Sequence, residues 1–443
     1  MNNNINKDKG ILLSIRVDPT FLPVATSFVE NSALAFGLNK KEALALTLAT
    51  EEIFLYLIKA SSTDHIITIR CSSGIYYVKA DFLFSANNFN MRAFNLTTTI
   101  SPHEEASLEE MGLLIASRSV DRLQVKQEGA QSIHLILTKE KSYPSVDEFD
   151  LTTLPSVENV VEFSIKSATG EDLKLFVMLL NSHYKSFSFP KDFRFPGKVV
   201  DMVRSGEYEA VVAIDQKERI IGGTLWHWLG SKTVECFGPY IFTQGSDLSI
   251  AERLIEECIK AIAKSDAVGL INRYPTLELP KDYFEPLGSL TFFTKDGSPF
   301  SITAYFRQMQ EDLGSTVWSH PALEEFLKEE YKRLVLPRMI RLVRDQGETK
   351  EQFSVLSAEF DRINNFVTLR PLCSGLDSDK NIGAHLDLFK KESLSTIFFE
   401  MDLGKSWQVE FVPALFNHNF KPRIILPYGG IGDIVLFQLG EKH

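Results

Sequence analysis

Three polar side chains in the middle of the chain could do acid–base chemistry. Glu235 lies in TVECFGPYIF and His227 in IIGGTLWHWL, two segments that are otherwise mostly apolar. A carboxylate or an imidazole beside a substrate can accept a proton from an attacking amine, and the phenol of Tyr283 in KDYFEPLG could return one. The alternative is that Glu235 and His227 lie on a solvated strand face and that Tyr283 packs against its neighbours.

A second set of candidates lies in the first 112 residues of the chain. Glu52 lies in ALTLATEEIFLYLIKA, and Tyr56 follows one helical turn later. Ser85 and Asn87 lie in DFLFSANNFNM, and a serine hydroxyl can donate or accept a hydrogen bond. Gly112, in EEMGLLIASRSVD, is the last of the set. In the alternative interpretation Glu52 lies on a solvated helix edge, Tyr56 at the rim of the core, and Gly112 at a helix N-terminus without a phosphate.

The elements that position this second set form an α+β unit that ends at residue 141. ILLSIRVDP alternates like a strand, and apolar residues at three- and four-residue steps predict helices over 21–36 and 40–60. HIITIRCSS, IYYVKADFLF and SIHLILTKE are rich in β-branched and aromatic residues and predict strands. MGLLIASRSVDRL predicts a helix between the last two. The expected fold is a compact α+β sandwich.

This order of elements and the phrase at 45–60 resemble GHKL ATPases, especially the anti-sigma-factor serine kinases. In that family a Glu on this helix acts as a base and an Asn four residues later holds magnesium; Glu52 matches the first position, but Tyr56 stands at the second. Ser85 and Asn87 stand at the first and third positions of the family's D-x-G motif, and Gly112 is what remains of its phosphate-covering G-x-G. The resemblance implies an ATP site weakened by these replacements and a protein partner for this unit.

The rest of the chain predicts a linker and two α/β units. KSYPSVDEFDLTTLPSVENV interrupts the periodic patterns, so a linker is expected at 142–159. The second unit, 160–299, has a strand and a helix, a hairpin across QKER, the strand TVECFGPYIF and the helix IAERLIEECIKAIAK. The third, 300–443, opens with a long amphipathic stretch bent or broken at Pro337, and then repeats the order of hairpin, loop, helix, strand, helix and strand.

Residues 160–299 resemble a GNAT acetyltransferase, in which a strand and loop lead into a helix N-terminus that binds coenzyme A. Backbone amides and the helix dipole attract a diphosphate there. The resemblance implies acetyl-CoA or another acyl-CoA as ligand. KDYFEPLGSLTFF resembles the family's terminal pattern, a Tyr-bearing helix before a strand, and Phe284 stands at the general-acid position, one residue after Tyr283. The alternative is a capped surface helix behind a glycine-containing turn. The matching residues of the strand and loop are Phe237, Gly238, Ser246, Ser249 and Ala251.

The last 140 or so residues resemble the same family a second time. Asn381 and Gly383 in RPLCSGLDSDKNIGAHLDLFKK match the small-residue end of the coenzyme A loop. The glycines of PYGGIGDIVLFQ could suggest a phosphate loop, but that motif requires a following helix, and IVLFQ predicts a strand. A hairpin turn is therefore expected. His385 and His418 lack companion acids, so no metal site is predicted.

Composition excludes several classes of protein. The net charge of −11, without a basic block, argues against a general nucleic-acid binder. The four cysteines are far apart and form no C-x-x-C pair, which favours a reducing compartment. The polar start MNNNINKDKG has no apolar signal segment, and no run of about 18 apolar residues follows. We expect a soluble, cytoplasmic bacterial protein without membrane or nucleic-acid partners.

The fold class expected is multidomain α+β and α/β, a GHKL-type sandwich followed by two GNAT-like mixed-sheet units. The function expected is regulatory or sensory, in which the ATPase-like unit binds a protein partner and the GNAT-like units bind an acyl-CoA or a related ligand. One alternative is an active N-acyltransferase that uses acetyl-CoA held at Phe237–Ala251 or at Asn381–His385. A second alternative is an ATP- and magnesium-dependent serine kinase that acts on a regulatory protein.

Overall fold

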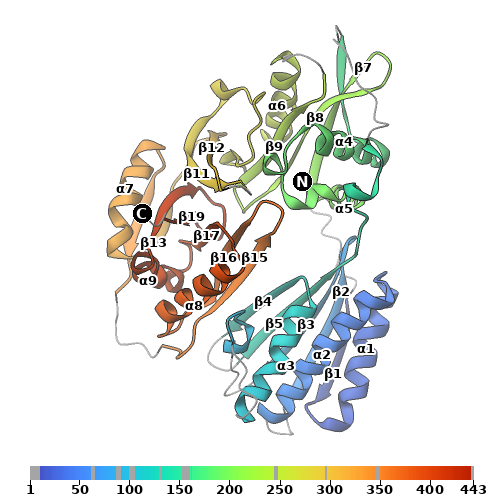
Figure 1. The fold of residues 1–443 in the computed structure, drawn as a ribbon, viewed down its shortest axis with the longest axis vertical. Coiled ribbons are helices and arrows are strands. Elements are labelled where there is room, and N and C mark those ends of the chain that lie inside the picture. Colours follow the sequence, from blue (N-terminus) through green and yellow to red (C-terminus); the bar gives the residue numbers. More distant parts are fainter. Residues whose placement is uncertain are drawn as a thin grey trace. The chain divides into compact units, whose positions relative to one another are not determined.

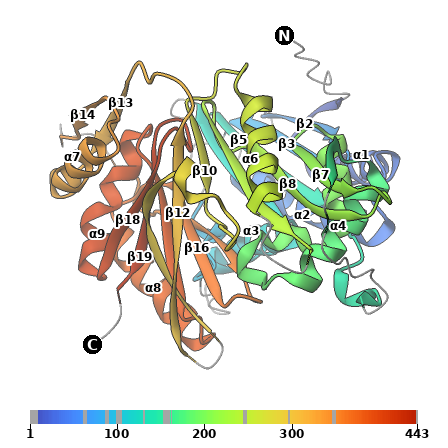
Figure 2. The same cartoon turned by 90° about the horizontal axis from the view of Figure 1, so that it is seen from above.

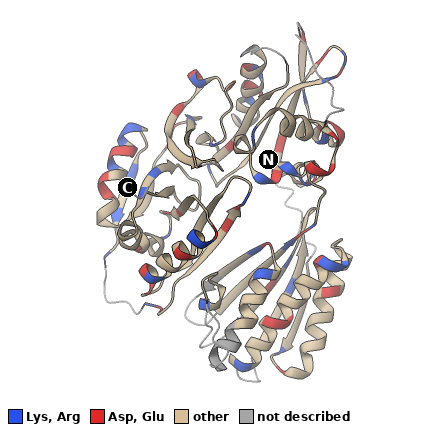
Figure 3. Cartoon of the chain, in the orientation of Figure 1, with Lys and Arg blue, Asp and Glu red and all other residues tan. Residues whose placement is uncertain are grey.

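The computed structural model describes residues 10–60, 65–85, 91–98, 105–128, 132–151, 160, 162–243, 248–294, 297–344 and 350–440. The chain divides into two compact units, Met1–Ser142 with Phe353–Ser357, and Tyr143–Gln352 with Ala358–His443. The two expected GNAT-like segments thus fall almost entirely within one compact unit. None of the described helices is both long and apolar enough to cross a membrane. Acidic and basic residues are both scattered along the ribbon (Figure 3).

The first unit is a five-stranded antiparallel sheet with helices over one face (Figure 1). The strand order is β1 (Ile11–Arg16), β2 (Ile66–Ser73), β3 (Tyr77–Ser85), β5 (Ser132–Glu140) and β4 (Arg122–Glu128). The helices are α1 (Leu22–Ala35), α2 (Lys40–Ala60) and α3 (Glu105–Ser119). The predicted third helix began too late and ran too far, because α3 begins at Glu105 and ends at Ser119, and the chain enters β4 at Arg122.

The helix α2 shows how local sequence determines this unit. A reciprocal cap starts it: Oδ1 of Asn39 accepts from the Glu42 amide at 3.0 Å, and Oε2 of Glu42 accepts from the Asn39 amide at 2.8 Å. Leu46, Ile53 and Leu57 then bury one stripe of the helix against the sheet. The cap therefore sets the start of the helix, and the apolar stripe sets the face that it buries.

The second unit opens with a seven-stranded sheet in the order β11-β12-β10-β9-β8-β7-β6. Only β9 and β10 run parallel, because α6 connects them, and the pairs on either side are antiparallel. The strands are β6 (Phe163–Ser167), β7 (Tyr208–Asp215), β8 (Ile220–Trp228), β9 (Thr233–Ile241), β10 (Gly269–Asn272), β11 (Glu285–Phe293) and β12 (Pro299–Gln308), and the helices are α4 (Gly170–His183), α5 (Pro196–Arg204) and α6 (Leu248–Ile262).

Two sequence predictions for this sheet differ from the structure. The boundary expected at residue 299 falls at the start of β12, which pairs with β10 and β11 and so belongs to this sheet. The Tyr-bearing helix expected around Tyr283 is a three-residue turn, η7 (Lys281–Tyr283), and β11 follows at Glu285. Pro280 and Pro286 flank this segment, and proline removes the amide that a continuing helix needs. The hairpin predicted across QKER is confirmed by the pairing of β7 and β8.

A small β–α–β segment follows, in which β13 (Ser315–Ser319) and β14 (Arg338–Leu342) run parallel on either side of α7 (Glu324–Arg333). The long amphipathic stretch predicted here is therefore a helix and then a strand. The break comes before Pro337, because Val335 has a positive φ of 54°, which a helix cannot include.

The C-terminal sheet has the order β15-β16-β17-β19-β18, with α8 and α9 on one face (Figure 2). This order repeats β8-β9-β10-β12-β11 of the larger sheet, including one parallel pair followed by an antiparallel hairpin. The order of elements that the sequence predicted to repeat is thus seen in the topology. The elements are β15 (Val355–Asp361), β16 (Phe366–Cys373), α8 (Ser378–Lys391), β17 (Thr396–Asp402), α9 (Val412–Asn417), β18 (Phe420–Leu426) and β19 (Ile434–Leu439).

Candidate functional site

The parallel strands β9 and β10 pair over three residues and then separate. Their last paired residues are Glu235 and Ile271. Beyond that point Gly238 has a positive φ of 91°, and the proline that follows it has no amide hydrogen to offer a neighbouring strand. Part of the β9 edge, from Gly238 onward, therefore opens toward the loop that follows β10. This is the segment expected to hold acyl-CoA.

Two buried side chains, one at the end of β10 and one in the loop after it, bind the opened edge. Nδ2 of Asn272 donates to the carbonyl oxygen of Gly238 at 2.7 Å, and Oγ1 of Thr276 donates to that of Pro239 at 2.7 Å. Asn272 is fully buried, and its Oδ1 accepts from the Tyr274 amide at 3.0 Å. The loop thus closes the gap between the strands with hydrogen bonds of its own.

A third side chain, Tyr184 at the end of α4, binds the far end of the same edge. Its hydroxyl accepts from the Ile241 amide at 2.8 Å and donates to the Ile241 carbonyl at 3.2 Å. Burial raises the pKa of Tyr184, so the hydroxyl stays protonated and can both accept and donate a hydrogen bond. An extended ligand that paired with β9 would need these same backbone groups.

Glu235 is held by two partners and is 1% exposed. Nε and Nη2 of Arg273 donate to its two oxygens at 2.6 and 2.8 Å, and Nε2 of His227 lies 3.1 Å from Oε2. Burial raises the pKa of Glu235, but Arg273 and His227 lower it further, to about 2. A carboxylate with this pKa is a weak proton acceptor at neutral pH, so the expected role of Glu235 as general base does not fit its surroundings.

The structure brings His227 and Glu235 together and leaves Tyr283 elsewhere. The His227 ring stacks on that of Tyr208, with centroids 4.7 Å apart and planes at 7°. The Tyr283 hydroxyl lies 3.4 Å from Oε1 of Glu256 on α6. Tyr283 therefore contacts the outer surface of α6, in keeping with the packing alternative.

A chain of alternating charges runs from this group into the C-terminal sheet. Nη1 of Arg273 lies 3.8 Å from Oε1 of Glu400, and Glu400 also pairs with Nε of Arg370. Nη1 of Arg370 lies 2.7 Å from Oε2 of Glu359, and Oε1 of Glu359 lies 2.8 Å from Nζ of Lys191. Every charge in this series has a partner of opposite sign, so the series joins the two sheets without an unpaired ion.

The two sheets carry these charges at corresponding strands. In the larger sheet the group lies on β8, on β9 and just after β10, as His227, Glu235 and Arg273. In the C-terminal sheet it lies on β15, β16 and β17, as Glu359, Arg370 and Glu400, and the central residue changes sign. The repeated topology therefore extends to the positions of polar residues inside each sheet.

The C-terminal sheet also closes the gap between its parallel strands. The pairing of β16 and β17 ends at Leu369 and Phe399. Beyond it, Oε1 of the buried Gln408 accepts from the Asp402 amide at 2.7 Å, and Nε2 points to the Pro371 carbonyl at 3.5 Å. The side chain of Gln408 thus bridges the gap between β16 and β17, as the side chain of Asn272 bridges the gap between β9 and β10.

The second candidate coenzyme A loop is not a loop. Asn381 and Gly383 lie inside α8, which begins at Ser378, and the Asn381 amide already donates to the Asp377 carbonyl at 2.9 Å. A side chain at 383 would meet Cε1 of His418 at 3.1 Å. The expected loop is corrected to the second turn of a helix, whose amides are used within the helix.

The glycine-rich turn PYGGIGD joins β18 and β19, which confirms the predicted hairpin. Two backbone amides of this turn, together with the amide of Gly404, bind the carboxylate of Asp402. Oδ1 of Asp402 accepts from the amides of Gly404 and Gly432, each at 2.9 Å, and Oδ2 accepts from that of Ile431 at 3.0 Å. Asp402 thus occupies the position at which such amides could bind an anion.

In the first unit, Glu52 and Gly112 meet where α2 packs on α3. Gly112 is in the middle of α3, and a Cβ at this position would lie 2.5 Å from Oε2 of Glu52. The sequence placed Gly112 at the start of a helix, and this is corrected, because α3 already begins at Glu105. Tyr56 is 8% exposed, in keeping with a residue at the rim of the core, and Ser85 is exposed at the end of β3.

Two of the remaining candidates, Asn87 and Ser246, lie outside the residues that the structure describes. Phe237 and Ala251 are buried in the core, and Ser249 lies in the first turn of α6. Among the described residues, no group of three His, Cys, Asp or Glu side chains is placed to hold a metal ion.

Sequence reasoning missed Tyr184, Asn272, Arg273 and Gln408. Asn272 and Arg273 come at the end of a short apolar strand, where a polar pair could have been noticed. Tyr184 and Gln408 have no comparable signal. Tyr184 directly follows α4 and Gln408 lies in a 3-10 helix, η9 (Ser406–Phe411), and each meets its partners only through the fold.

No family model matches this chain, and no curated protein matches it. Solved structures of N-acetyltransferases are similar to about a third of it. An N-acetyltransferase from Staphylococcus aureus Mu50 covers 34% of this chain and 99% of its own, at 14% identity and a TM-score of 0.27. A spermidine/spermine N-acetyltransferase from Vibrio cholerae covers 33% and 93%, at 16% identity and a TM-score of 0.26. An aminoglycoside 6'-acetyltransferase of type Ii covers 33% and 98%, at 14% identity and a TM-score of 0.25.

Proposed function

We propose that this chain is a regulatory protein that works by binding a protein partner, and that its acetyltransferase-like unit does not transfer acyl groups. The observation that carries the proposal is the occupied edge of β9. Tyr184 binds both backbone groups of Ile241. Asn272 and Thr276 bind the carbonyls of Gly238 and Pro239. A ligand that bound along this edge would have to displace three side chains and leave their polar groups without partners.

The acid–base groups support the same conclusion. Transfer of an acyl group to an amine needs a proton acceptor near the attacking nitrogen. Glu235 is ionised but bound to Arg273, and its pKa of about 2 makes it a poor acceptor. Tyr283 contacts α6 rather than the opened edge. Positioning alone would have to supply the rate, and the site for positioning is filled.

The first unit supports binding rather than phosphoryl transfer. Tyr56 stands where the resemblance calls for a magnesium ligand, and a phenol is a poor ligand for this hard cation. Glu52 contacts α3 at Gly112, and burial and the neighbouring Glu51 raise its pKa. The nucleotide-binding fold that the sequence resembles would therefore serve as a surface for a protein partner.

Thermal unfolding of the full chain tests this proposal. A ligand at about 100 times its dissociation constant stabilises the state that binds it by roughly 2.7 kcal/mol. We expect no shift in Tm with acetyl-CoA or with Mg-ATP. A shift with acetyl-CoA would contradict the proposal in favour of an acyltransferase, and a shift with Mg-ATP would favour the kinase.

A matched pair of variants tests the role of the tyrosine hydroxyl. Tyr184→Phe frees both backbone groups of Ile241, whereas Tyr240→Phe removes a buried hydroxyl that donates to the Ser188 carbonyl at 2.9 Å. If the hydroxyl of Tyr184 closes the edge, acetyl-CoA should shift Tm more in Tyr184→Phe than in Tyr240→Phe. Equal behaviour of the two variants would show that Tyr184 does not control access.

A further inference from the structure

One short segment from far along the chain belongs to the first unit. Phe353–Ser357 is part of that compact unit, although the residues on either side of it belong to the second unit. Ser354, Val355 and Leu356 are each 1% exposed or less. The first unit is therefore completed by a buried segment that is separate from the rest of its sequence.

The side chain of Asn95 binds this segment through its backbone. Nδ2 donates to the Ser354 carbonyl oxygen at 2.8 Å, and Oδ1 accepts from the Leu356 amide at 2.9 Å. These two backbone groups point to the same edge of an extended chain, and a neighbouring parallel strand would bind the same pair. Asn95 is 3% exposed, so both hydrogen bonds are shielded from water. The Asn95 amide therefore binds the segment as an adjacent strand would.

A short turn with hydrogen bonds of its own presents Asn95. The residue directly follows the 3-10 helix η2 (Met91–Phe94), and its amide donates to the Arg92 carbonyl at 2.9 Å. Oγ1 of Thr98 donates to the same carbonyl at 2.8 Å. Phe94 is buried and anchors the turn in the core. The position of Asn95 is therefore set by residues of the first unit that are close to it in the chain.

The side chains of the segment give the contact its specificity. The guanidinium carbon of Arg92 lies 4.8 Å from the centroid of the Phe353 ring, and the buried Val355 and Leu356 follow. No residue of the segment is charged. Backbone hydrogen bonds are the same for every extended peptide, whereas these side chains are not. The contact therefore selects an aromatic residue that is followed, two and three positions later, by aliphatic residues.

We propose that Asn95 and Arg92 form a peptide-binding site, that Phe353–Ser357 occupies it as an internal ligand, and that an extended segment of a partner protein with the same pattern displaces it. The inference rests on the proposed function, because it names the surface to which the protein partner binds. The internal segment blocks the site, so the contact is autoinhibitory. Because this segment is tethered, a free peptide competes against a high effective concentration and binds weakly until the contact is loosened.

Fluorescence anisotropy with a labelled peptide of residues 351–358, EQFSVLSA, tests the inference on the full chain. Two substitutions at one position form a matched pair, and both lie before β15 begins at Val355. Phe353→Lys places a cation beside Arg92 and should loosen the internal segment, whereas Phe353→Glu places an anion there and should keep it bound. The peptide should bind Phe353→Lys at least about tenfold more tightly than it binds Phe353→Glu or wild type.

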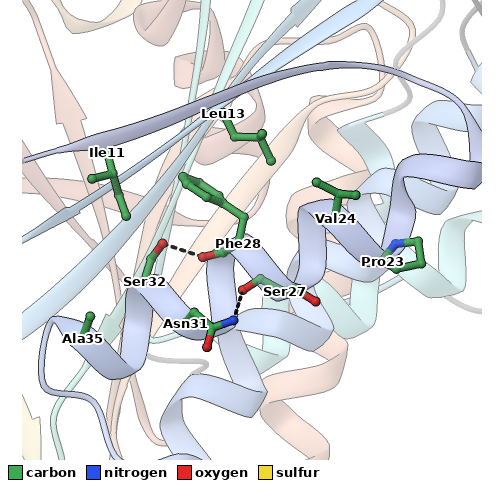
Figure 4. Close-up of a pocket in the computed structure, with 9 residues that line it drawn as sticks. All are labelled: Ile11, Leu13, Pro23, Val24, Ser27, Phe28, Asn31, Ser32 and Ala35. Carbon is green, nitrogen blue, oxygen red and sulfur yellow. Dashed lines mark hydrogen bonds between the residues drawn. The ribbon is translucent and has the colours of Figure 1, made fainter.

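Two controls locate the bound peptide. Methylation of the peptide's backbone nitrogen at the position of Leu356 removes the N–H that Asn95 accepts, and should weaken binding to Phe353→Lys by about tenfold. The apolar groove of about 650 Å³ between β1 and α1 is another surface at which an apolar peptide could bind (Figure 4). Val24→Arg, added to Phe353→Lys, places a charge in that groove and should leave peptide binding unchanged.

Equal binding to Phe353→Lys and Phe353→Glu, equal binding of the two peptides, or loss of binding with Val24→Arg would overturn the inference. Excess unlabelled peptide should also speed hydrogen exchange of the Leu356 amide in wild type, because it displaces the internal segment. Unchanged exchange would overturn the inference even if a variant failed to fold.

These outcomes are separate from those that test the proposed function. A Tm shift with acetyl-CoA or Mg-ATP would contradict the proposed function whatever the peptide does. Failure of the peptide to bind, without any such Tm shift, would contradict only the internal ligand.

Discussion

Arg273 and Glu400 meet between the two sheets of the second unit, with Nη1 of the arginine 3.8 Å from Oε1 of the glutamate. Each has a closer partner in its own sheet, Glu235 for the arginine and Arg370 for the glutamate. The contact therefore joins two ion-pair groups that are each complete within one sheet. We expect it to stabilise the packing of the sheets more than either sheet alone.

Glu235→Gln should lower the free energy of unfolding by about 3 kcal/mol, because it leaves the Arg273 guanidinium largely buried without its main counter-ion. Urea unfolding of the full chain measures this difference. Glu392→Gln is the control, since its ion pair with Arg362 is exposed and should contribute less than about 1 kcal/mol. Equal losses in the two variants would show that burial of the Glu235 pair adds nothing.

The stability of the second unit should fall at acid pH in a way that depends on Glu235. Its pKa is lowered from 4.5 to about 2 in the folded chain. A carboxyl with a lowered folded pKa contributes stability that is complete above its unfolded pKa and is lost as pH falls toward the folded value. Between pH 4.5 and about 2, wild type should therefore lose more free energy of unfolding than Glu235→Gln. Parallel pH curves would contradict this assignment.

Asp402→Ala should leave the amides of Gly404, Ile431 and Gly432 without their carboxylate. Hydrogen bonds to a charged group contribute roughly 1.5–3 kcal/mol each, so we expect a loss of at least about 3 kcal/mol. Inorganic phosphate should restore part of the lost Tm in this variant and have a smaller effect on wild type, because an anion can replace the carboxylate. Equal effects of phosphate on both proteins would argue against an anion-binding turn.

Gly112 and Glu52 should be coupled in a double-mutant cycle. Alanine in a helix interior is favoured over glycine by about 1 kcal/mol, but a Cβ at 112 would lie 2.5 Å from Oε2 of Glu52. Gly112→Ala should therefore stabilise the Glu52→Ala chain more than it stabilises wild type. Thermal or urea unfolding of the four proteins measures the difference. Strict additivity would mean that the two residues do not contact one another.

Much of the fold could be predicted from local patterns. Helices over 21–36 and 40–60 and the hairpin across QKER follow from periodicity and turn residues, and the structure contains them within a few positions. The helix predicted at Tyr283 failed, and the long stretch predicted to bend or break at Pro337 ends its helix at Arg333 and continues as a strand. Both segments are short and lie next to prolines. There the sheet supplies hydrogen bonds that local propensity does not register.

The candidate site was predicted less well than the fold. Glu235 and His227 were each identified as a candidate base, and the structure places Nε2 of His227 3.1 Å from Oε2 of Glu235. Their role changed because Arg273, after another strand, takes both carboxylate oxygens. A single sequence shows that a carboxylate is present, but not which cation will neutralise it.

The sequence by itself determined the types and order of most elements, the repeated order of elements in the middle and last segments, and the acidic, cysteine-poor composition. These properties depend on residues close together in the chain, whose spacing decides which face is buried. Only the tertiary structure decided that Tyr184, Asn272 and Gln408 close the gaps between parallel strands and that Arg273 meets Glu400. Hydrogen bonds and ion pairs between distant residues depend on atomic positions that packing sets, and spacing in the sequence does not contain them.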